Sequence, residues 1–164
     1  MADTVFNVLF ICTGNSARSI LAEAILNREG RGKFRAFSAG SHPKGEVHPY
    51  ALDLLRRTNH PVAELRSKSW DEFAAPGAPQ LDFAFTVCDN AAGEVCPIWP
   101  GHPATAHWGY ADPSAGDGPE ADKREAFRQT LHQIKRRAEL LVNLPPDKLQ
   151  RTLLQQSARE LAQR

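Results

Sequence analysis

An apolar run near the start of this chain is followed at once by a polar loop and then by helical spacing. Residues 5–11 are almost continuously apolar, as expected of a strand that is buried on both faces of a sheet. From Ser19 the apolar residues recur at helical intervals until Gly30. This order of strand, loop and helix predicts the first unit of a parallel sheet, with residues 12–18 as the connecting loop.

The rest of the chain repeats this alternation of strands and helices. Further strands are predicted over residues 33–39, 81–87 and 104–108. Helices are predicted from Pro49, over 69–73, and between Pro119 and Pro145. We therefore expect one α/β domain, residues 1–146, in which a central four-stranded parallel sheet is flanked by helices. Residues 147–164 are expected to add a short amphipathic C-terminal helix.

Composition narrows the range of partners and compartments. The chain has 164 residues and a net charge of +1, which suits one soluble domain and gives no reason to expect nucleic-acid or membrane-surface binding. No apolar stretch approaches the roughly 18 residues of a membrane span, and the start lacks the features of a signal peptide. We therefore expect a cytoplasmic protein. Its three cysteines, an odd number, argue against a static disulfide framework.

Three chemically distinctive residues follow predicted strands. Cys12 and Cys88 lie at the carboxyl ends of two strands, and Asp112 comes shortly after the last one. Ligands of open parallel sheets bind beyond the carboxyl ends of the strands. These residues, although distant in sequence, should therefore converge on one edge of the sheet.

The loop after Cys12 has the features of an anion cradle. A turn that leads into a helix N-terminus points several backbone N–H groups at one spot, where the helix dipole adds positive potential. Gly14 and Asn15 tolerate the positive φ angles of such a turn, and Arg18 offers a bidentate donor to a tetrahedral oxyanion. The predicted oxyanion-binding residues are Thr13, Gly14, Asn15, Ser16, Ala17 and Arg18.

The same positive field acts on the cysteine that opens the loop. Helix N-termini and nearby cations lower the pKa of a thiol, so we expect the pKa of Cys12 to be lowered and its sulfur to be nucleophilic. The hydroxyl of Ser19 is positioned in sequence to donate a hydrogen bond to the thiolate. One loop would thus bind an oxyanion and aim an ionised sulfur at its central atom.

Several motifs resemble one known family. CTGNSARS is similar to the active-site loop of the low-molecular-weight protein tyrosine phosphatases, and especially of the arsenate reductases built on that fold. The stretches FSAGSHPKGEVHPYAL, FTVCDNAAGEVCP and AHWGYADP occur in the order and spacing of those reductases. The resemblance covers roughly residues 5–143, nearly the whole chain, and by itself implies a fold of the low-molecular-weight phosphatase type.

The resemblance also implies a reaction, the reduction of arsenate to arsenite, as in arsenic detoxification. Cys12 would form a thiol–arsenate adduct, with Asp112 as the acid for the leaving oxygen. Cys88 would then attack Cys12 and release arsenite, and Cys96 would attack Cys88. The resulting Cys88–Cys96 disulfide would be reduced by thioredoxin or by a glutaredoxin and glutathione system. No cofactor is required in this scheme.

Two other functions use the same residues. A low-molecular-weight phosphatase would hydrolyse phosphomonoesters with Cys12, Arg18 and Asp112 and would need no second thiol. Its relatives usually place tyrosines after the Asp-Pro pair, whereas Ser114 follows here, which favours a small inorganic substrate. A non-enzymatic thiol redox or oxyanion sensor would keep the thiols but has no need of Asp112.

Two features of the sequence depart from the family pattern, and the remaining predictions concern metals. The spacing from Cys88 to Cys96 is one residue longer than in thioredoxin-linked members, and alanine stands at position 17, where many relatives carry a cysteine. Some relatives bind potassium beside the loop, and the matching oxygen-bearing residues are Asn15, Glu23, Ser38 and Asp71. The same four residues also suit a hydrogen-bond network that supports the loop. A zinc site would use Cys88, Cys96, His102 and His107, although this spacing is wide for zinc.

Overall fold

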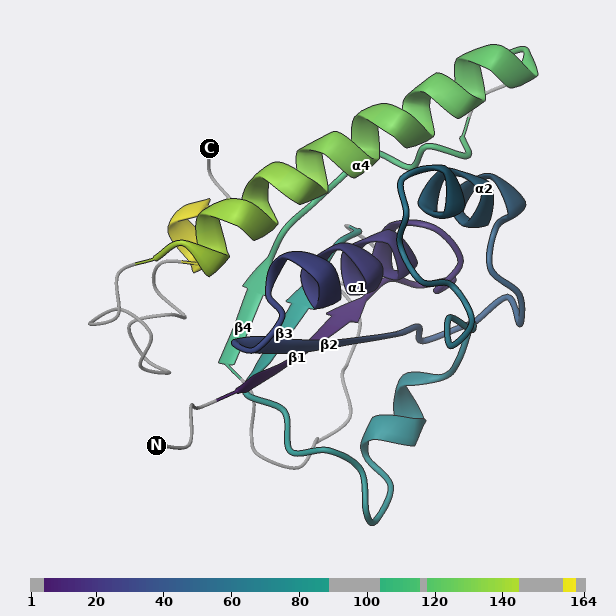
Figure 1. Ribbon diagram of the computed structural model, residues 1–164. Helices are drawn as coiled ribbons and strands as arrows, with labels where there is room; N and C mark the ends of the chain where they lie inside the picture. Colours follow the sequence, from purple (N-terminus) through teal and green to yellow (C-terminus); the bar gives the residue numbers. More distant parts are fainter. Residues whose placement is uncertain (1–4, 89–103, 116–117, 145–157, 162–164) are drawn as a thin grey trace.

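Four parallel strands form the centre of the computed structural model, which describes residues 5–88, 104–115, 118–144 and 158–161 (Figure 1). The strands are β1 (Phe6–Ile11), β2 (Phe34–Ala39), β3 (Phe83–Thr86) and β4 (Ala104–His107). Their order in the sheet is β2-β1-β3-β4, and all neighbouring pairs are parallel. The predicted four-stranded parallel sheet is therefore confirmed, with each strand slightly shorter than predicted.

Helices follow the strands as the sequence predicted. They are α1 (Arg18–Glu29), α2 (Pro49–Arg57), the 3₁₀ helix η1 (Trp70–Phe73) and α4 (Glu120–Val142). Pro49 occupies the first turn of α2, where its missing N–H has no helical partner to lose, and His48 Nδ1 caps this helix by accepting the amide of Tyr50. The α1 helix lies beside the sheet and the longer α4 packs along α1 (Figure 1).

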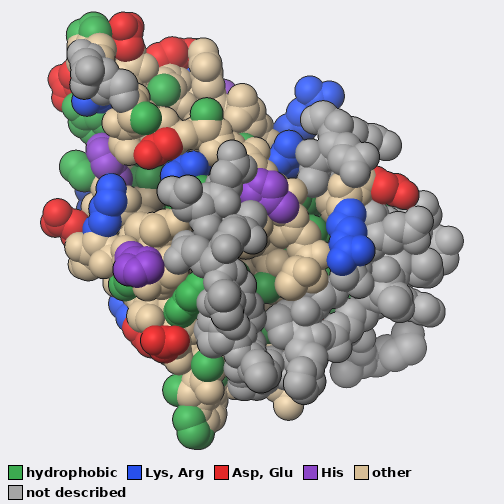
Figure 2. All heavy atoms as spheres, turned by 180° about the vertical axis from the view of Figure 1, so that it is seen from behind, with side chains coloured by type: hydrophobic (Ala, Val, Ile, Leu, Met, Phe, Trp, Pro, Cys, Tyr) green, Lys and Arg blue, Asp and Glu red, His purple; other side chains and the backbone are tan. Residues whose placement is uncertain are grey.

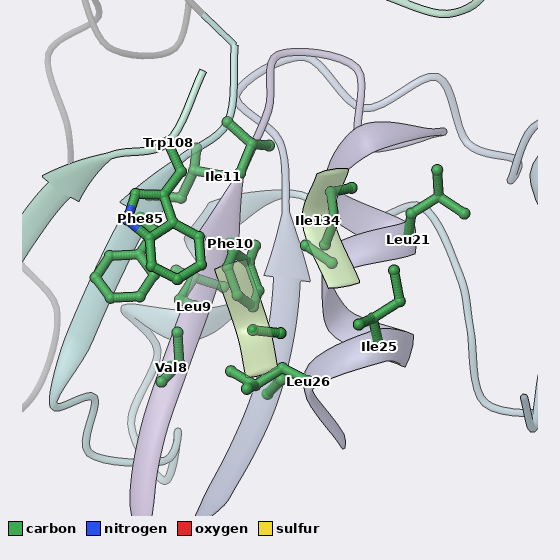
Figure 3. Close-up of a cluster of buried hydrophobic side chains, with 14 of the residues drawn as sticks. Val8, Leu9, Phe10, Ile11, Leu21, Ile25, Leu26, Phe85, Trp108 and Ile134 are labelled. Carbon is green, nitrogen blue, oxygen red and sulfur yellow. The ribbon is translucent and has the colours of Figure 1, made fainter. Parts of the chain in front are cut away.

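The core forms where β1 meets the helices. The side chains of Val8, Leu9, Phe10 and Ile11 are almost fully buried in β1, which is a central strand between β2 and β3. Figure 3 shows this cluster, in which Leu21, Ile25 and Leu26 of α1 and Ile134 of α4 also take part. Complete burial of one such side chain is worth about 1.5–3 kcal/mol, so β1 and α1 together anchor the loop that joins them.

The described part of the C-terminal segment packs on the domain. Residues 158–161 form a helical turn in which Ala158 and Leu161 are buried. The indole Nε1 of Trp108 donates to the Ala158 carbonyl at 2.9 Å. This confirms a short C-terminal helix. The rest of the predicted segment 147–164, and its boundary at residue 146, lie outside the described residues.

The topology brings four chain segments to one edge of the sheet. The residues after β1, β2, β3 and β4 all leave the sheet at its carboxyl edge, because the strands are parallel. On the face that Figure 2 shows, basic, acidic and histidine side chains are interspersed, in keeping with the small net charge. No helix among the described residues is both long and apolar enough to cross a membrane.

Candidate active site

The loop between β1 and α1 is fixed from outside through its carbonyl groups. The carbonyl groups of Thr13, Gly14 and Ser16 each accept a hydrogen bond from a main-chain amide outside the loop. The donors, all between β2 and α2, are His42 at 2.9 Å, Lys44 at 3.0 Å and His48 at 2.8 Å. The N–H and C=O of a trans peptide point in opposite directions, so these bonds turn the following amides toward the inside of the loop. This is the arrangement expected of an anion cradle.

Asn15 holds the bend of the loop. Its φ is 44°, in the left-handed region that asparagine tolerates, as predicted. Its buried side-chain amide donates to Ser19 Oγ at 2.8 Å, and its Oδ1 accepts the amide of Lys68 at 2.8 Å. The backbone bend is thus fixed by side-chain bonds to α1 and to the segment before η1.

Two glycines provide space rather than unusual torsion angles. A Cβ on Gly40, just after β2, would lie 2.5 Å from the Thr13 carbonyl oxygen, so only glycine allows this close approach to the loop. Gly14 was predicted to use a positive φ, and this is wrong, because Asn15 alone among the loop residues does so. A Cβ on Gly14 would instead meet the side chain of Lys44 at 3.2 Å.

The loop encloses a small polar cavity at the carboxyl edge of the sheet. Its volume is about 230 Å³. It is lined by Cys12, Thr13, Gly14, Asn15, Ser16, Ala17, Arg18, His42, Lys44, Asp112 and Ser114. All six predicted oxyanion-binding residues, the predicted nucleophile and the predicted acid therefore face one space, whose size suits a single tetrahedral oxyanion better than a large organic group.

Arg18 connects the loop to the segment that carries Asp112. Its guanidinium donates to the Tyr110 carbonyl at 3.0 Å and lies 3.8 Å from Asp112 Oδ2. Burial raises the pKa of Asp112, but hydrogen bonds from the hydroxyl and amide of Ser114, together with the positive charges of Arg18 and Lys44, hold it below its usual value. The convergence of residues 12, 88 and 112 expected from the parallel sheet is confirmed.

Cys88 meets Cys12 beneath the loop. Its sulfur accepts the amide of Thr13 at 3.3 Å, and both thiols are buried. A hydrogen bond with the Cys88 thiol and burial raise the pKa of Cys12, whereas Arg18 and the Gly14 amide lower it. The expectation of a lowered Cys12 pKa is therefore wrong in this arrangement, because a second buried sulfur opposes a charge on the first. The pair of thiols carries one negative charge far more readily than two.

Other predicted site residues have different outcomes. Ser19 Oγ is buried and accepts the Asn15 side-chain amide, so its hydrogen bond to the thiolate stays a prediction. Cys96, which belongs to the predicted terminal disulfide and to the zinc alternative, and His102, which belongs to the zinc alternative, lie outside the described residues. His107 Nδ1 bonds the Thr86 hydroxyl at 2.7 Å. Within the described ranges, no cluster of three or more His, Cys, Asp or Glu side chains suits a metal ion.

Three of the four residues predicted for potassium or a supporting network, Asn15, Glu23 and Ser38, lie around Lys68. Ser38 Oγ donates to Glu23 Oε1, and Lys68 Nζ lies 3.8 Å from the same oxygen. Burial raises the pKa of Glu23 and lowers the pKa of Lys68, and the opposite charge of each partner counteracts the shift. Asp71 is exposed in the first turn of η1.

Sequence reasoning missed His42 and Lys44 as pocket residues. Neither His42 nor Lys44 was singled out from the sequence, yet both line the cavity. Both follow β2, so the rule that ligands bind beyond the carboxyl ends of parallel strands applies to them as well as to Cys12 and Cys88. That signal was present in the sequence.

A larger hollow lies along β2 and is separate from this site. Its volume is about 800 Å³, and it is bounded by α1, β2, residues 61–68 and η1. Its arginines include Arg66, which pairs with Glu72, and Arg28, which donates to the Thr58 carbonyl. Neither Cys12 nor Cys88 lines it, whereas Cys12, Arg18 and Asp112 line the smaller cavity.

Comparison with known proteins agrees with this geometry. The family model described as low molecular weight phosphotyrosine protein phosphatase matches residues 7–156. An arsenate reductase of Halalkalibacterium halodurans is 32% identical over 130 residues, which cover 79% of this chain and 90% of that protein. The solved arsenate reductase from Archaeoglobus fulgidus has a TM-score of 0.64 at 27% identity and covers 84% of this chain and 99% of its own. A thioredoxin-dependent arsenate reductase of Corynebacterium glutamicum has a TM-score of 0.55 at 25% identity, covering 85% of this chain and 65% of that one. These matches confirm the resemblance seen in the motifs, and this chain belongs to the low molecular weight phosphotyrosine protein phosphatase family.

Proposed function

We propose that this protein reduces arsenate to arsenite. The observation that carries the proposal is the contact between two buried thiols, Cys12 and Cys88, beside a cavity lined by loop amides and Arg18. A phosphatase of this family type needs one nucleophilic sulfur, whereas reduction of As(V) to As(III) consumes the two electrons that a pair of thiols supplies when it becomes a disulfide. The arsenate reductases among the similar proteins support the same reaction.

The first step forms a sulfur–arsenic bond. Cys12 gives up its thiol proton as its sulfur attacks arsenic, Cys88 stays protonated, and the loop amides and Arg18 hold the oxyanion. One arsenate hydroxyl leaves as water, and Asp112 relays to it the proton that Cys12 has lost. The product is an As(V) adduct on Cys12, so no electrons have yet moved to arsenic.

The second step carries out the reduction. Cys88 attacks the sulfur of Cys12 and forms a disulfide bond, and its thiol proton passes to an oxygen of the departing arsenite. The electron pair of the sulfur–arsenic bond stays on arsenic, which departs as arsenite. We propose that Cys96 then attacks Cys88 and that a dithiol protein of the thioredoxin or glutaredoxin type reduces the resulting disulfide. The thioredoxin-dependent relative favours thioredoxin as the reductant.

An arsenate assay tests this proposal directly. Arsenite release is measured with the thioredoxin system and, separately, with glutaredoxin and glutathione, for the wild type and for Cys88→Ser. We expect repeated turnover by the wild type and none by Cys88→Ser, since the variant has no thiol to attack the adduct. Hydrolysis of p-nitrophenyl phosphate is measured in parallel and should persist in Cys88→Ser. Normal arsenate turnover by Cys88→Ser would contradict the two-thiol mechanism, and phosphatase turnover without arsenate reduction in the wild type would favour a phosphatase.

A further inference from the structure

Lys68 is a largely buried cation whose backbone contacts the oxyanion loop and whose side chain, with that of Glu23, borders the larger hollow. Its side chain is 8% exposed, and its Nζ donates to the Arg66 carbonyl at 2.7 Å and lies 3.8 Å from Glu23 Oε1. The Glu23 side chain is itself only 12% exposed. Lysine and glutamate are almost never buried to this extent unless they are paired, because removing either charge from water is expensive. The position of this pair therefore calls for a role.

The main chain of Lys68 touches the loop directly. Its amide donates to Asn15 Oδ1 at 2.8 Å, and its carbonyl accepts the amide of Gly40 at 2.9 Å. Asn15 carries the left-handed bend of the loop, and Gly40 packs against the Thr13 carbonyl. A shift of Lys68 would thus be passed to two points of the cradle, although Lys68 does not line the cavity.

The residues predicted for potassium do not fit that ion here. A potassium ion binds where several oxygens converge with no other cation beside them. Asn15 Oδ1 already accepts the Lys68 amide, and the Ser38 hydroxyl is bonded to the Glu23 carboxylate. The remaining candidate, Asp71, has an exposed side chain on η1. The carboxylate that would attract the ion already faces a resident ammonium.

We propose that Lys68 is a positioning residue whose buried ammonium supplies, beside Glu23, the positive charge that a bound potassium ion would otherwise supply. The ammonium neutralises Glu23, which keeps the Ser38 and Glu23 pair in place, and the Lys68 backbone holds Asn15. Loop geometry and oxyanion affinity are then independent of potassium. This inference concerns the site of the proposed function and extends it to the ion requirement of the enzyme.

Inorganic phosphate is the probe, because it is a tetrahedral oxyanion that the loop can bind without any redox chemistry. Its affinity is measured by calorimetry on the full chain, in potassium chloride and in choline chloride of equal ionic strength. The proteins are the wild type, Lys68→Met and Lys68→Arg. We expect equal affinity in both salts for the wild type and for Lys68→Arg, which keeps the charge. Lys68→Met should bind phosphate severalfold more weakly in choline and recover affinity in potassium, since Glu23 and Ser38 can then attract the ion.

Thermal unfolding in the same two salts accompanies each titration. If Lys68→Met folds in potassium but not in choline, the proposal is supported. If it folds in neither, the double variant Lys68→Met/Glu23→Gln, which removes both charges of the pair, decides the matter. The proposal is supported if the double variant binds phosphate more weakly than the wild type and equally in both salts. It is overturned if the double variant binds phosphate as tightly as the wild type. The proposal is also overturned by a wild type whose phosphate affinity rises with potassium, or by a folded Lys68→Met that matches the wild type in choline.

The test is independent of arsenate chemistry. A wild type that binds phosphate equally in both salts but does not reduce arsenate would refute the proposed function and leave the role of Lys68 standing. Arsenate turnover in the two salts is measured alongside. If the wild type reduces arsenate normally but only in potassium, the proposed function stands and the role of Lys68 is refuted.

Discussion

The oxyanion loop and the segment that carries Asp112 face the same cavity but are held in different ways. The loop, residues 12–18, is bonded from outside by amides between β2 and α2 and by Lys68. The acid segment, residues 110–115, supports Asp112 mainly from within, through the hydroxyl and amide of Ser114. The Asp112 side chain is 41% exposed, whereas most of the loop is buried.

This difference separates binding from proton transfer. Dipoles that are already aimed at the place where charge develops need no reorganisation during the reaction, which explains why the loop is fixed from several sides. An acid needs only to reach the leaving oxygen, so short-range support is enough for it. Variants of the reacting groups should therefore change rates while the loop continues to bind oxyanions.

Replacement of Cys12 by serine should have the largest effect. The hydroxyl of serine is far less acidic than a thiol and cannot form the sulfur–arsenic bond, so arsenate reduction and aryl phosphate hydrolysis should fall by roughly 10⁴-fold or more. Phosphate affinity should remain within about threefold of the wild type, because the loop amides and Arg18 supply the binding. Arsenite release and calorimetry measure the two properties. Loss of phosphate affinity in Cys12→Ser would show that the loop is not fixed independently of the sulfur.

Asp112→Asn should have the next largest effect. An amide of the same shape cannot donate the proton that the leaving oxygen needs, so the single-turnover rate of adduct formation should fall by roughly 10²–10⁴-fold. Phosphate affinity should change little, since the acid does not form the cradle. The matched control is Asp122→Asn, an exposed acid in the first turn of α4 that does not line the cavity. Equal single-turnover rates in wild type and Asp112→Asn would remove Asp112 from the mechanism.

The sequence predicted the parts of this site that depend on consecutive residues or on sheet topology. The loop and Arg18 were visible because strand, loop and helix follow one another, and Cys88 was placed by the parallel-sheet rule. The direction of the Cys12 pKa was not predictable, because it depends on the contact between Cys12 and Cys88 across the sheet edge. The burial of Lys68 was equally hidden, since its polar segment carries no periodic pattern that would indicate its partner, Glu23.

Lys44 lies between the two regions and should have a moderate effect. Its backbone fixes the Gly14 carbonyl, while its side chain lines the cavity and its charge lowers the pKa of Asp112. Lys44→Met should reduce kcat/KM for arsenate by roughly 3–10-fold at low salt, and the difference should shrink as salt screens the charge. Lys135→Met, which removes an exposed charge on α4, is the control. A reduction that persists unchanged at high salt would indicate a packing role for the Lys44 side chain.

Ser114→Ala should have the smallest effect on rate and the clearest effect on titration. The variant loses the hydroxyl that donates to Asp112 Oδ1 at 2.7 Å but keeps the amide that donates at 2.9 Å. Burial already raises the pKa of Asp112, so removing one of the groups that lower it should move the pKa upward. An NMR titration of the labelled carboxyl measures this shift. An unchanged titration would mean that Ser114 does not hold the acid.

The same substitution has a defined consequence for stability against pH. Because the folded-state pKa of Asp112 is lowered, its ionised form contributes stability above the unfolded-state pKa, and this contribution is lost as the pH falls through the folded-state pKa. Ser114→Ala brings the two pKa values closer together. The contribution should therefore be smaller in the variant, and its loss should be complete at a higher pH than in the wild type. If unfolding of the two proteins depends equally on acid, the low pKa of Asp112 is due mainly to Arg18 and not to the Ser114 hydroxyl. Asp112 would then be held by a residue of the oxyanion loop.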